Sequence, residues 1–172
     1  MKHTKLFIWT LILLLFSVTV AVAQDSLPIE KTELSIGEHV HFYSAVLEED
    51  RALNIYLPAS YSEDPSKKYP VIFLLDGAIE EDFLHVAGLV QFASFPWIEM
   101  IPESIMVGIV NVDRRRDFTY PTQNEKDKID FPTTGHSNAF IRFVEEELEG
   151  FIEEQYRCTD ERTIIGQSLG AL

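Results

Sequence analysis

The chain has 172 residues, of which 46% are hydrophobic, and carries 28 acidic against 14 basic side chains, a net charge of −14. This length suits one domain, and the acidic surface disfavours nucleic acid and anionic membranes as partners. Because Cys158 is its one cysteine, the chain can form no intramolecular disulfide and offers no cysteine-rich metal site.

The N-terminus has the pattern of a secretory signal peptide. Lys2 and Lys5 precede a mainly apolar run over residues 6–20, and Ala21-Val22-Ala23 supplies small residues where a signal peptidase reads them. The run is short for a membrane span, which needs about 20 apolar residues. We therefore predict cleavage after position 23, a mature domain over residues 24–172 without a membrane anchor, and export to the periplasm or the extracellular space.

The mature segment up to residue 110 predicts four strands. Residues 40–47 are rich in β-branched and aromatic side chains, and residues 51–57 alternate between apolar and polar positions, as in a half-buried strand. Residues 71–75 (VIFLL) and 105–110 (IMVGIV) are apolar at every position. Such runs are typical of strands buried on both faces of a parallel sheet.

Helical patterns alternate with these strands. Apolar residues recur at helical spacing over residues 79–92, and residues 138–156 combine one apolar stripe with a glutamate-rich face that is expected to be solvated. The charged stretch 114–137 is predicted to be a long loop, and residues 162–165 form another apolar strand. This order of elements predicts an α/β sheet with crossover helices.

The last predicted strand runs into the motif G-x-S-x-G, formed by Gly166, Ser168 and Gly170. A nucleophilic serine needs a sharp, strained turn between a strand and a helix, where bulky neighbours do not fit. We therefore predict Ser168 as a nucleophile, with the amide of Leu169 at the start of the new helix as an oxyanion donor. The alternative for Ser168 is an ordinary tight turn without a catalytic part.

A second oxyanion donor is expected from the loop after the strand 71–75, which begins Asp76-Gly77-Ala78. The amide of Gly77 or of Ala78 can supply it, because a glycine lets the backbone approach a substrate closely. An Asp-Gly turn without a catalytic part is the other interpretation.

Four stretches follow one another in the chain: YPVIFLLDG (69–77), NVDRRRDFTYP (111–121), AFIRFVEEELEGFIEEQYR (139–157) and RTIIGQSLGAL (162–172). Together they resemble the putative-esterase family of α/β-hydrolases, which includes the enterochelin-esterase-like and esterase D-like enzymes. The resemblance implies a mostly parallel sheet with flanking helices and Ser168 as the nucleophile. It also implies hydrolysis of small-molecule or saccharide-linked carboxylic esters without a metal or an organic cofactor.

Two arginines in the second stretch are candidate substrate contacts. The loop that follows the fourth strand in this family resembles residues 113–121 here. Arg114 and Arg116 in this loop could therefore meet an acidic or phenolic substrate. We favour an internal ion pair instead, such as Arg116 with Asp117 or Asp113, because exposed charged loops usually solvate themselves.

Four residues follow Ser168, so the acid and the histidine that come after the serine in α/β-hydrolases have no place in this sequence. His85 or His136 would have to lie within about 3 Å of the hydroxyl to replace them. We therefore expect the N-terminal part of a longer exported hydrolase, truncated after the serine turn, inactive alone, and with its last strand as a sheet edge. The alternative is a non-catalytic secreted binding module built on a partial hydrolase fold.

Overall fold

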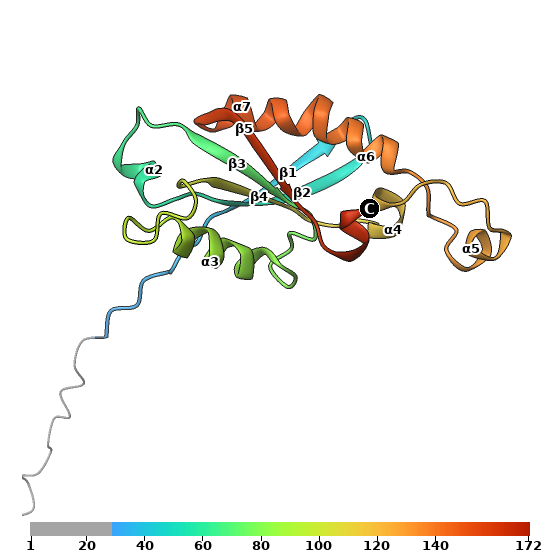
Figure 1. Cartoon of the computed structure of the whole chain (residues 1–172), viewed down its shortest axis with the longest axis horizontal. Helices are drawn as coiled ribbons and strands as arrows, with labels where there is room; N and C mark the ends of the chain where they lie inside the picture. Colours follow the sequence, from blue (N-terminus) through green and yellow to red (C-terminus); the bar gives the residue numbers. More distant parts are fainter. Residues whose placement is uncertain (1–28) are drawn as a thin grey trace, which may run out of the picture. The chain divides into compact units, whose positions relative to one another are not determined.

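A five-stranded sheet with helices on both faces forms the centre of the fold (Figure 1). The structure, a computed structural model, describes residues 29–172, so the predicted signal peptide (1–23) lies outside the described residues. Ser35–Leu172 forms one compact unit. Its elements are β1 (Glu38–Ser44), β2 (Glu49–Tyr56), α2 (Ser60–Glu63), β3 (Tyr69–Leu74), α3 (Phe83–Ala93), β4 (Ile105–Ile109), α4 (Arg114–Phe118), α5 (Glu125–Asp130), α6 (Ser137–Phe143), the π-helical η1 (Val144–Leu148), α7 (Glu149–Gln155), β5 (Cys158–Ile165) and the 3₁₀-helical η2 (Ser168–Ala171).

The sheet has the strand order β1-β2-β4-β3-β5. β2 runs antiparallel to both β1 and β4, whereas β3 is parallel to β4 and to β5. Four strands therefore point one way and β2 points the other, which confirms the predicted mostly parallel sheet. Parallel neighbours need long crossover connections, and α3 and the stretch from α4 to α7 provide them.

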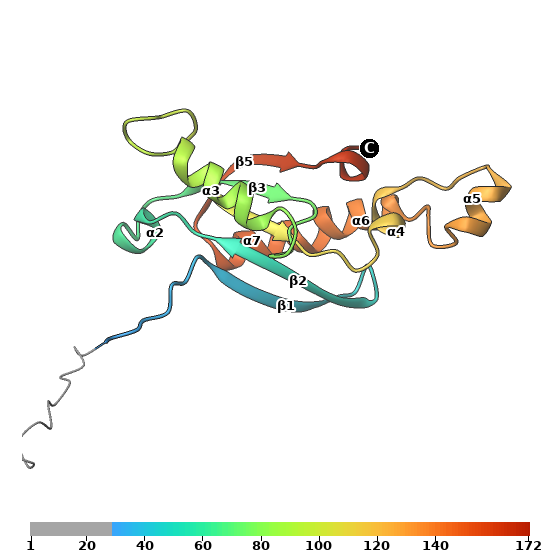
Figure 2. The same cartoon turned by 90° about the horizontal axis from the view of Figure 1, so that it is seen from below.

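Helix α3 covers one face of the sheet, and the continuous helical stretch α6–η1–α7 covers the other (Figures 1 and 2). This burial on both sides corrects one prediction, because β2 is not half-buried. Asn54 and Tyr56, on its second face, are only 3% and 9% exposed. Tyr56 packs in the cluster beneath α3, together with Phe83 and Ala87.

The stretch 114–137 is not the predicted unstructured loop, since it contains the short helices α4 and α5. The carboxylate of Asp113 caps α4 by accepting from the amides of Arg115 and Arg116 at 3.1 and 3.0 Å. The side chain of Asn124 caps α5 in the same way. Helices of about one turn depend on such caps and are too short to show a periodic apolar pattern.

The predicted long helix is present, but its glutamate-rich face is not all solvated. Glu147 lies in the π-helical segment η1 and turns back to the β1–β2 connection. Its carboxylate accepts hydrogen bonds from the hydroxyl of Ser44 (2.5 Å) and from the amides of Ala45 (2.8 Å) and Val46 (3.0 Å). A π-turn shifts side chains around the helix axis. Here the π-helical segment carries Glu147, whose carboxylate holds the β1–β2 hairpin against the helix.

β5 forms an edge of the described sheet, as expected for the last strand. It begins earlier than predicted, because Cys158 already pairs with Tyr69 of β3. Ile164 in this strand remains 61% exposed. β5 thus brings the G-x-S-x-G motif to the end of the sheet next to the loop that follows β3.

Candidate active site

Ser168 stands at the turn between β5 and η2 in a conformation that is unusual for a residue with a side chain. Its φ is +54°, in the left-handed region, and the residue is exposed. A non-glycine residue in this region is strained and persists only where its surroundings hold it. The sharp, strained turn predicted from the motif is therefore present.

The two motif glycines are not equivalent. A Cβ at Gly166 would lie 2.1 Å from the carbonyl oxygen of Gly170, so the turn closes only when residue 166 is glycine. A Cβ at Gly170 would lie 3.4 Å from Asp76 and 3.5 Å from Leu75, which is ordinary contact. Of the two motif positions, only position 166 therefore requires a residue without a side chain.

This difference predicts unequal effects of two alanine substitutions. Gly166→Ala should lower the free energy of unfolding by about 1–3 kcal/mol, because the new methyl group overlaps backbone atoms. Gly170→Ala is the matched control and should change it by less than about 0.5 kcal/mol. Urea unfolding followed by circular dichroism measures both values. Equal losses in the two variants would contradict the close approach at residue 166.

The loop after β3 is held rigidly on both sides of Gly77. The Gly77 amide donates to the carbonyl of Ile109 at 3.0 Å, and the Gly77 carbonyl accepts from Asn54 Nδ2 at 2.8 Å. A Cβ at Gly77 would lie 2.3 Å from the Cα of Gly108, so the loop crosses β4 in backbone contact. Because the Gly77 amide is already used, Ala78 is the remaining oxyanion candidate of the two.

Arg114 joins this loop to the serine turn. Its Nε and Nη2 donate to the two carboxylate oxygens of Asp76 at 2.5 and 2.9 Å, and Nη2 also donates to the Gln167 carbonyl at 3.1 Å. Burial alone would raise the pKa of Asp76, but hydrogen bonds from Arg114 and Asn111 outweigh it and hold the pKa below its ordinary value. Asp76 has a φ of +56°, so Arg114 joins this strained residue to the carbonyl of Gln167, which directly precedes the strained Ser168.

Arg116 makes the internal ion pair that was favoured from the sequence over a substrate contact. Its Nη1 and Nη2 donate to Glu49 at 2.8 and 2.6 Å, and its Nε donates to Asp117 at 2.7 Å. The predicted ion pair with Asp117 is thus present, and each guanidinium nitrogen of Arg116 donates to a carboxylate of this chain. The hydrogen bonds that Arg116 donates, first to Glu49 and then to Asp117, raise its pKa. The buried Arg51 completes the network by donating to Asp117 at 2.8 Å.

The described histidines do not contact the Ser168 hydroxyl. Nδ1 of His39 is 2.6 Å from a side-chain oxygen of β2, and the ring of His41 packs edge-on against it. His85 is exposed on α3, and His136 lies in a hollow beside the β1–β2 turn. Within residues 29–172, no histidine is hydrogen-bonded to Ser168.

Known proteins share the sequence features of this chain. The sequence profile of the family described as "Putative esterase" matches residues 44–172. The chain belongs to this esterase family. It is 34% identical over 137 residues to the ferri-bacillibactin esterase BesA of Bacillus subtilis, with 72% of this chain and 47% of BesA covered. It is 32% identical over 135 residues to the uncharacterized protein YjcH of the same organism, covering 76% and 50%.

Solved structures share the fold of this esterase-family chain. An IroE-like serine hydrolase from Shewanella oneidensis superposes with a TM-score of 0.69 at 34% identity, covering 78% of this chain and 43% of that one. The BES protein from Bacillus cereus superposes with a TM-score of 0.67 at 26% identity, covering 83% and 56%. The esterase-family chain spans about half the length of the curated relatives that it matches.

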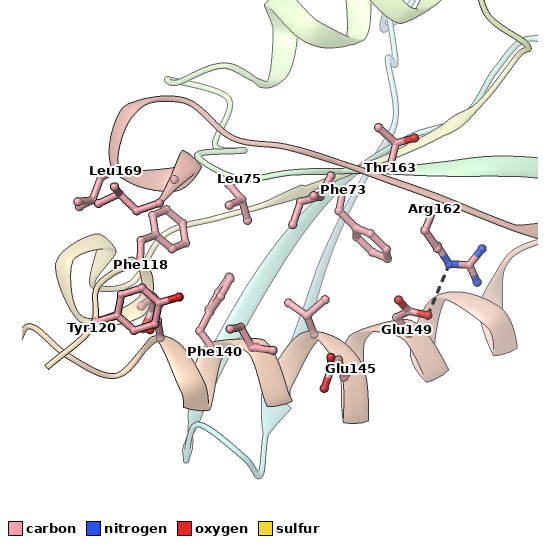
Figure 3. A pocket seen from close by; sticks show the side chains of 17 residues that line it. Phe73, Leu75, Phe118, Tyr120, Phe140, Glu145, Glu149, Arg162, Thr163 and Leu169 are labelled. Atoms are coloured by element: carbon pink, nitrogen blue, oxygen red, sulfur yellow. Dashed lines mark ion pairs between the residues drawn. The ribbon is translucent and has the colours of Figure 1, made fainter.

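An apolar cavity of about 400 Å³ borders the serine turn of this esterase-family chain, between β5 and the helical stretch α6–α7 (Figure 3). Phe118, Phe140 and Leu169 point into it, and Arg162 pairs with Glu149 at the other end, Nε to Oε2 at 3.6 Å. Leu169 and Gly170 reach the cavity from the turn, but Ser168 does not line it. The cavity therefore contacts the back of the turn and leaves the serine hydroxyl outside.

Over residues 29–172, no group of three or more His, Cys, Asp or Glu side chains stands close enough together to hold a metal ion. No helix in that range has the length and the hydrophobicity needed to cross a bilayer.

Proposed function

We propose that the gene product containing this chain is an exported serine esterase that hydrolyses carboxylic esters with Ser168 as its nucleophile. One observation carries the proposal: Ser168 is held at a φ of +54° on a turn that only a glycine at position 166 allows to close. Membership of the esterase family supports the reaction class. The signal-peptide pattern of residues 1–23 supports a periplasmic or extracellular location.

In the proposed mechanism, the Ser168 hydroxyl attacks the ester carbonyl and forms a tetrahedral intermediate. The amides of Leu169 and Ala78 donate to its oxyanion, and the acyl group passes from serine to water in a second step. Serine needs a base that accepts its proton. Because no described histidine is hydrogen-bonded to Ser168, we expect the base outside residues 29–172, and these residues alone should not turn over an ester.

The substrate proposal rests on the relatives. BesA is named as a ferri-bacillibactin esterase and is 34% identical to this chain. We therefore propose an ester of the siderophore type as the substrate class. The ion pair between Arg114 and Asp76 beside the serine turn leaves 35% of the arginine side chain exposed, so this side chain can still meet an acidic or phenolic group.

Covalent labelling tests the nucleophile directly. A fluorophosphonate transfers its phosphonyl group to an activated serine hydroxyl, so the complete gene product should gain one phosphonyl mass. After tryptic digestion, that mass should lie on the peptide that begins at Thr163 and contains Ser168. Unlabelled protein that still hydrolyses p-nitrophenyl butyrate, or a label on another serine, would overturn the proposal.

A further inference from the structure

Asn54 is a polar side chain buried in β2, only 3% exposed. A buried amide group needs partners for both its nitrogen and its oxygen. Nδ2 donates to the Gly77 carbonyl at 2.8 Å, and Oδ1 lies 2.6 Å from His39 Nδ1, from which it accepts. The orientation of the amide is unambiguous, because the Gly77 carbonyl can only accept and the opposite orientation would set two oxygens against each other.

The hydrogen bond to the Gly77 carbonyl also orients the next amide. That carbonyl and the N–H of Ala78 belong to one planar trans peptide unit, in which the two bonds point in opposite directions. Fixing the direction of the carbonyl therefore fixes the direction of the Ala78 N–H. Asn54 pulls the carbonyl toward β2, so the Ala78 N–H is directed away from β2.

Other contacts restrict the same peptide unit from the preceding side. The Gly77 amide donates to the Ile109 carbonyl at 3.0 Å, and the Gly77 backbone packs on Gly108, where even a Cβ has no room. Before it, Asp76 is held by Arg114. The remaining freedom is rotation of the Gly77–Ala78 peptide plane, and the hydrogen bond from Asn54 is the contact that opposes this rotation.

We infer that Asn54 is a positioning residue for the oxyanion hole: it aims the Ala78 amide at the developing oxyanion without touching the substrate. The inference rests on the proposed function, in which Ala78 is an oxyanion donor. Loss of one such donor costs about 10²–10³-fold in kcat. A donor that is present but poorly aimed should lose somewhat less, about 10–100-fold.

The test compares Asn54→Leu with Ser104→Ala in the complete gene product. Ser104 is the matched control because it is also buried (3% exposed) and also donates to a backbone carbonyl, that of Pro102 at 2.9 Å. It precedes β4, at the opposite end of the sheet from the Gly77 loop. Both substitutions remove a buried hydrogen bond, but only the first should affect the oxyanion hole.

For Asn54→Leu we expect kcat for p-nitrophenyl butyrate to fall by about 10–100-fold while KM stays within about 3-fold. Phenylboronic acid forms a tetrahedral adduct with serine, so its affinity should weaken by a similar factor. Ser104→Ala should keep kcat within about 2-fold. A kcat near the parental value in folded Asn54→Leu would overturn the inference, and so would a loss of kcat that leaves boronic acid binding intact.

Two further variants keep the outcome interpretable. If Asn54→Leu does not fold, Asn54→Ser replaces it, because the shorter hydroxyl cannot span to the Gly77 carbonyl, and the same losses are expected. Ser168→Ala reports on the proposed function separately. Loss of turnover in Ser168→Ala together with parental kcat in the Asn54 variants rejects the positioning role alone, whereas turnover that survives Ser168→Ala rejects both.

Discussion

Ser168→Ala in the complete gene product is expected to lower kcat for p-nitrophenyl butyrate by at least about 10⁴-fold, because removal of a serine nucleophile leaves only substrate binding and the oxyanion donors. KM should change little, since the hydroxyl acts in the transition state. Release of p-nitrophenolate measures both constants. Ser137→Ala is the control, because the Ser137 hydroxyl is buried without a hydrogen-bond partner among the described residues. It should leave kcat unchanged.

The same position offers a test of strain. In Ser168→Gly the left-handed φ of +54° loses its steric cost. The glycine variant should therefore unfold with a free energy about 1 kcal/mol higher than the alanine variant, while remaining equally inactive. Urea titrations of the two variants decide this point. If the glycine variant is the less stable one, residue 168 is not strained and the turn is an ordinary one.

Asp117→Ala is expected to lower the free energy of unfolding by about 3 kcal/mol, the lower end of the usual cost of breaking a buried ion pair, because Arg51 keeps its contact with Glu49 at 2.8 Å. The side chains of Asp117 and Arg51 are 1% and 0% exposed, and they are joined at 2.8 Å. The Arg51 guanidinium also lies over the rings of Phe140 and Phe143, at 5.6 and 5.4 Å. Urea unfolding measures the loss.

Two controls separate this effect from general damage. Arg142→Gln breaks the exposed pair with Glu146 and should leave the unfolding midpoint unchanged within error, since exposed pairs contribute little. The double variant Arg51→Met/Asp117→Ala should recover at least about 1 kcal/mol relative to Asp117→Ala, because the buried charge that lost its Asp117 partner is gone. A double variant as unstable as the single one would show that the loss comes from packing.

The buried network also bears on the active site. α4 carries Asp117 on the side that faces Arg51 and Arg114 on the side that faces Asp76. A loosened α4 therefore also loosens the brace on the serine turn. We expect Asp117→Ala to lose activity at temperatures where it is still folded, although the residue lies outside the candidate catalytic group.

The residue pattern was sufficient for the features that depend on local chemistry. Continuous apolar runs identified β3 and β4, because strands buried on both faces of a parallel sheet are apolar at nearly every position. The small residues around Ser168 identified the turn, because a strained strand-to-helix turn limits side-chain size at positions near in sequence. The loop that begins Asp76-Gly77 was predicted to supply an oxyanion donor, because a glycine lets the backbone approach a substrate closely.

The roles of individual residues in these segments depended on partners far away in the sequence. The pattern could not choose between Gly77 and Ala78, because the Gly77 amide is used by Ile109 and its carbonyl by Asn54, and both partners lie on other strands. The pattern also could not tell which of Arg114 and Arg116 lies beside the serine turn, because their partners lie far away in the sequence. The one pairs with Asp76 after β3, and the other with Glu49 in β2.

The sequence by itself therefore determined the fold class and the position of the serine turn, since both follow from hydrophobic pattern and local steric limits, and its resemblance to known sequences indicated the esterase family. Only the tertiary structure decided which amide remains free beside that turn and which arginine braces it. It also showed that Asn54, which from the sequence is one polar residue in an alternating strand, faces the candidate oxyanion loop. Hydrogen-bond partners are set by the packing of strands and helices against one another, and that packing is not encoded in any one stretch of residues.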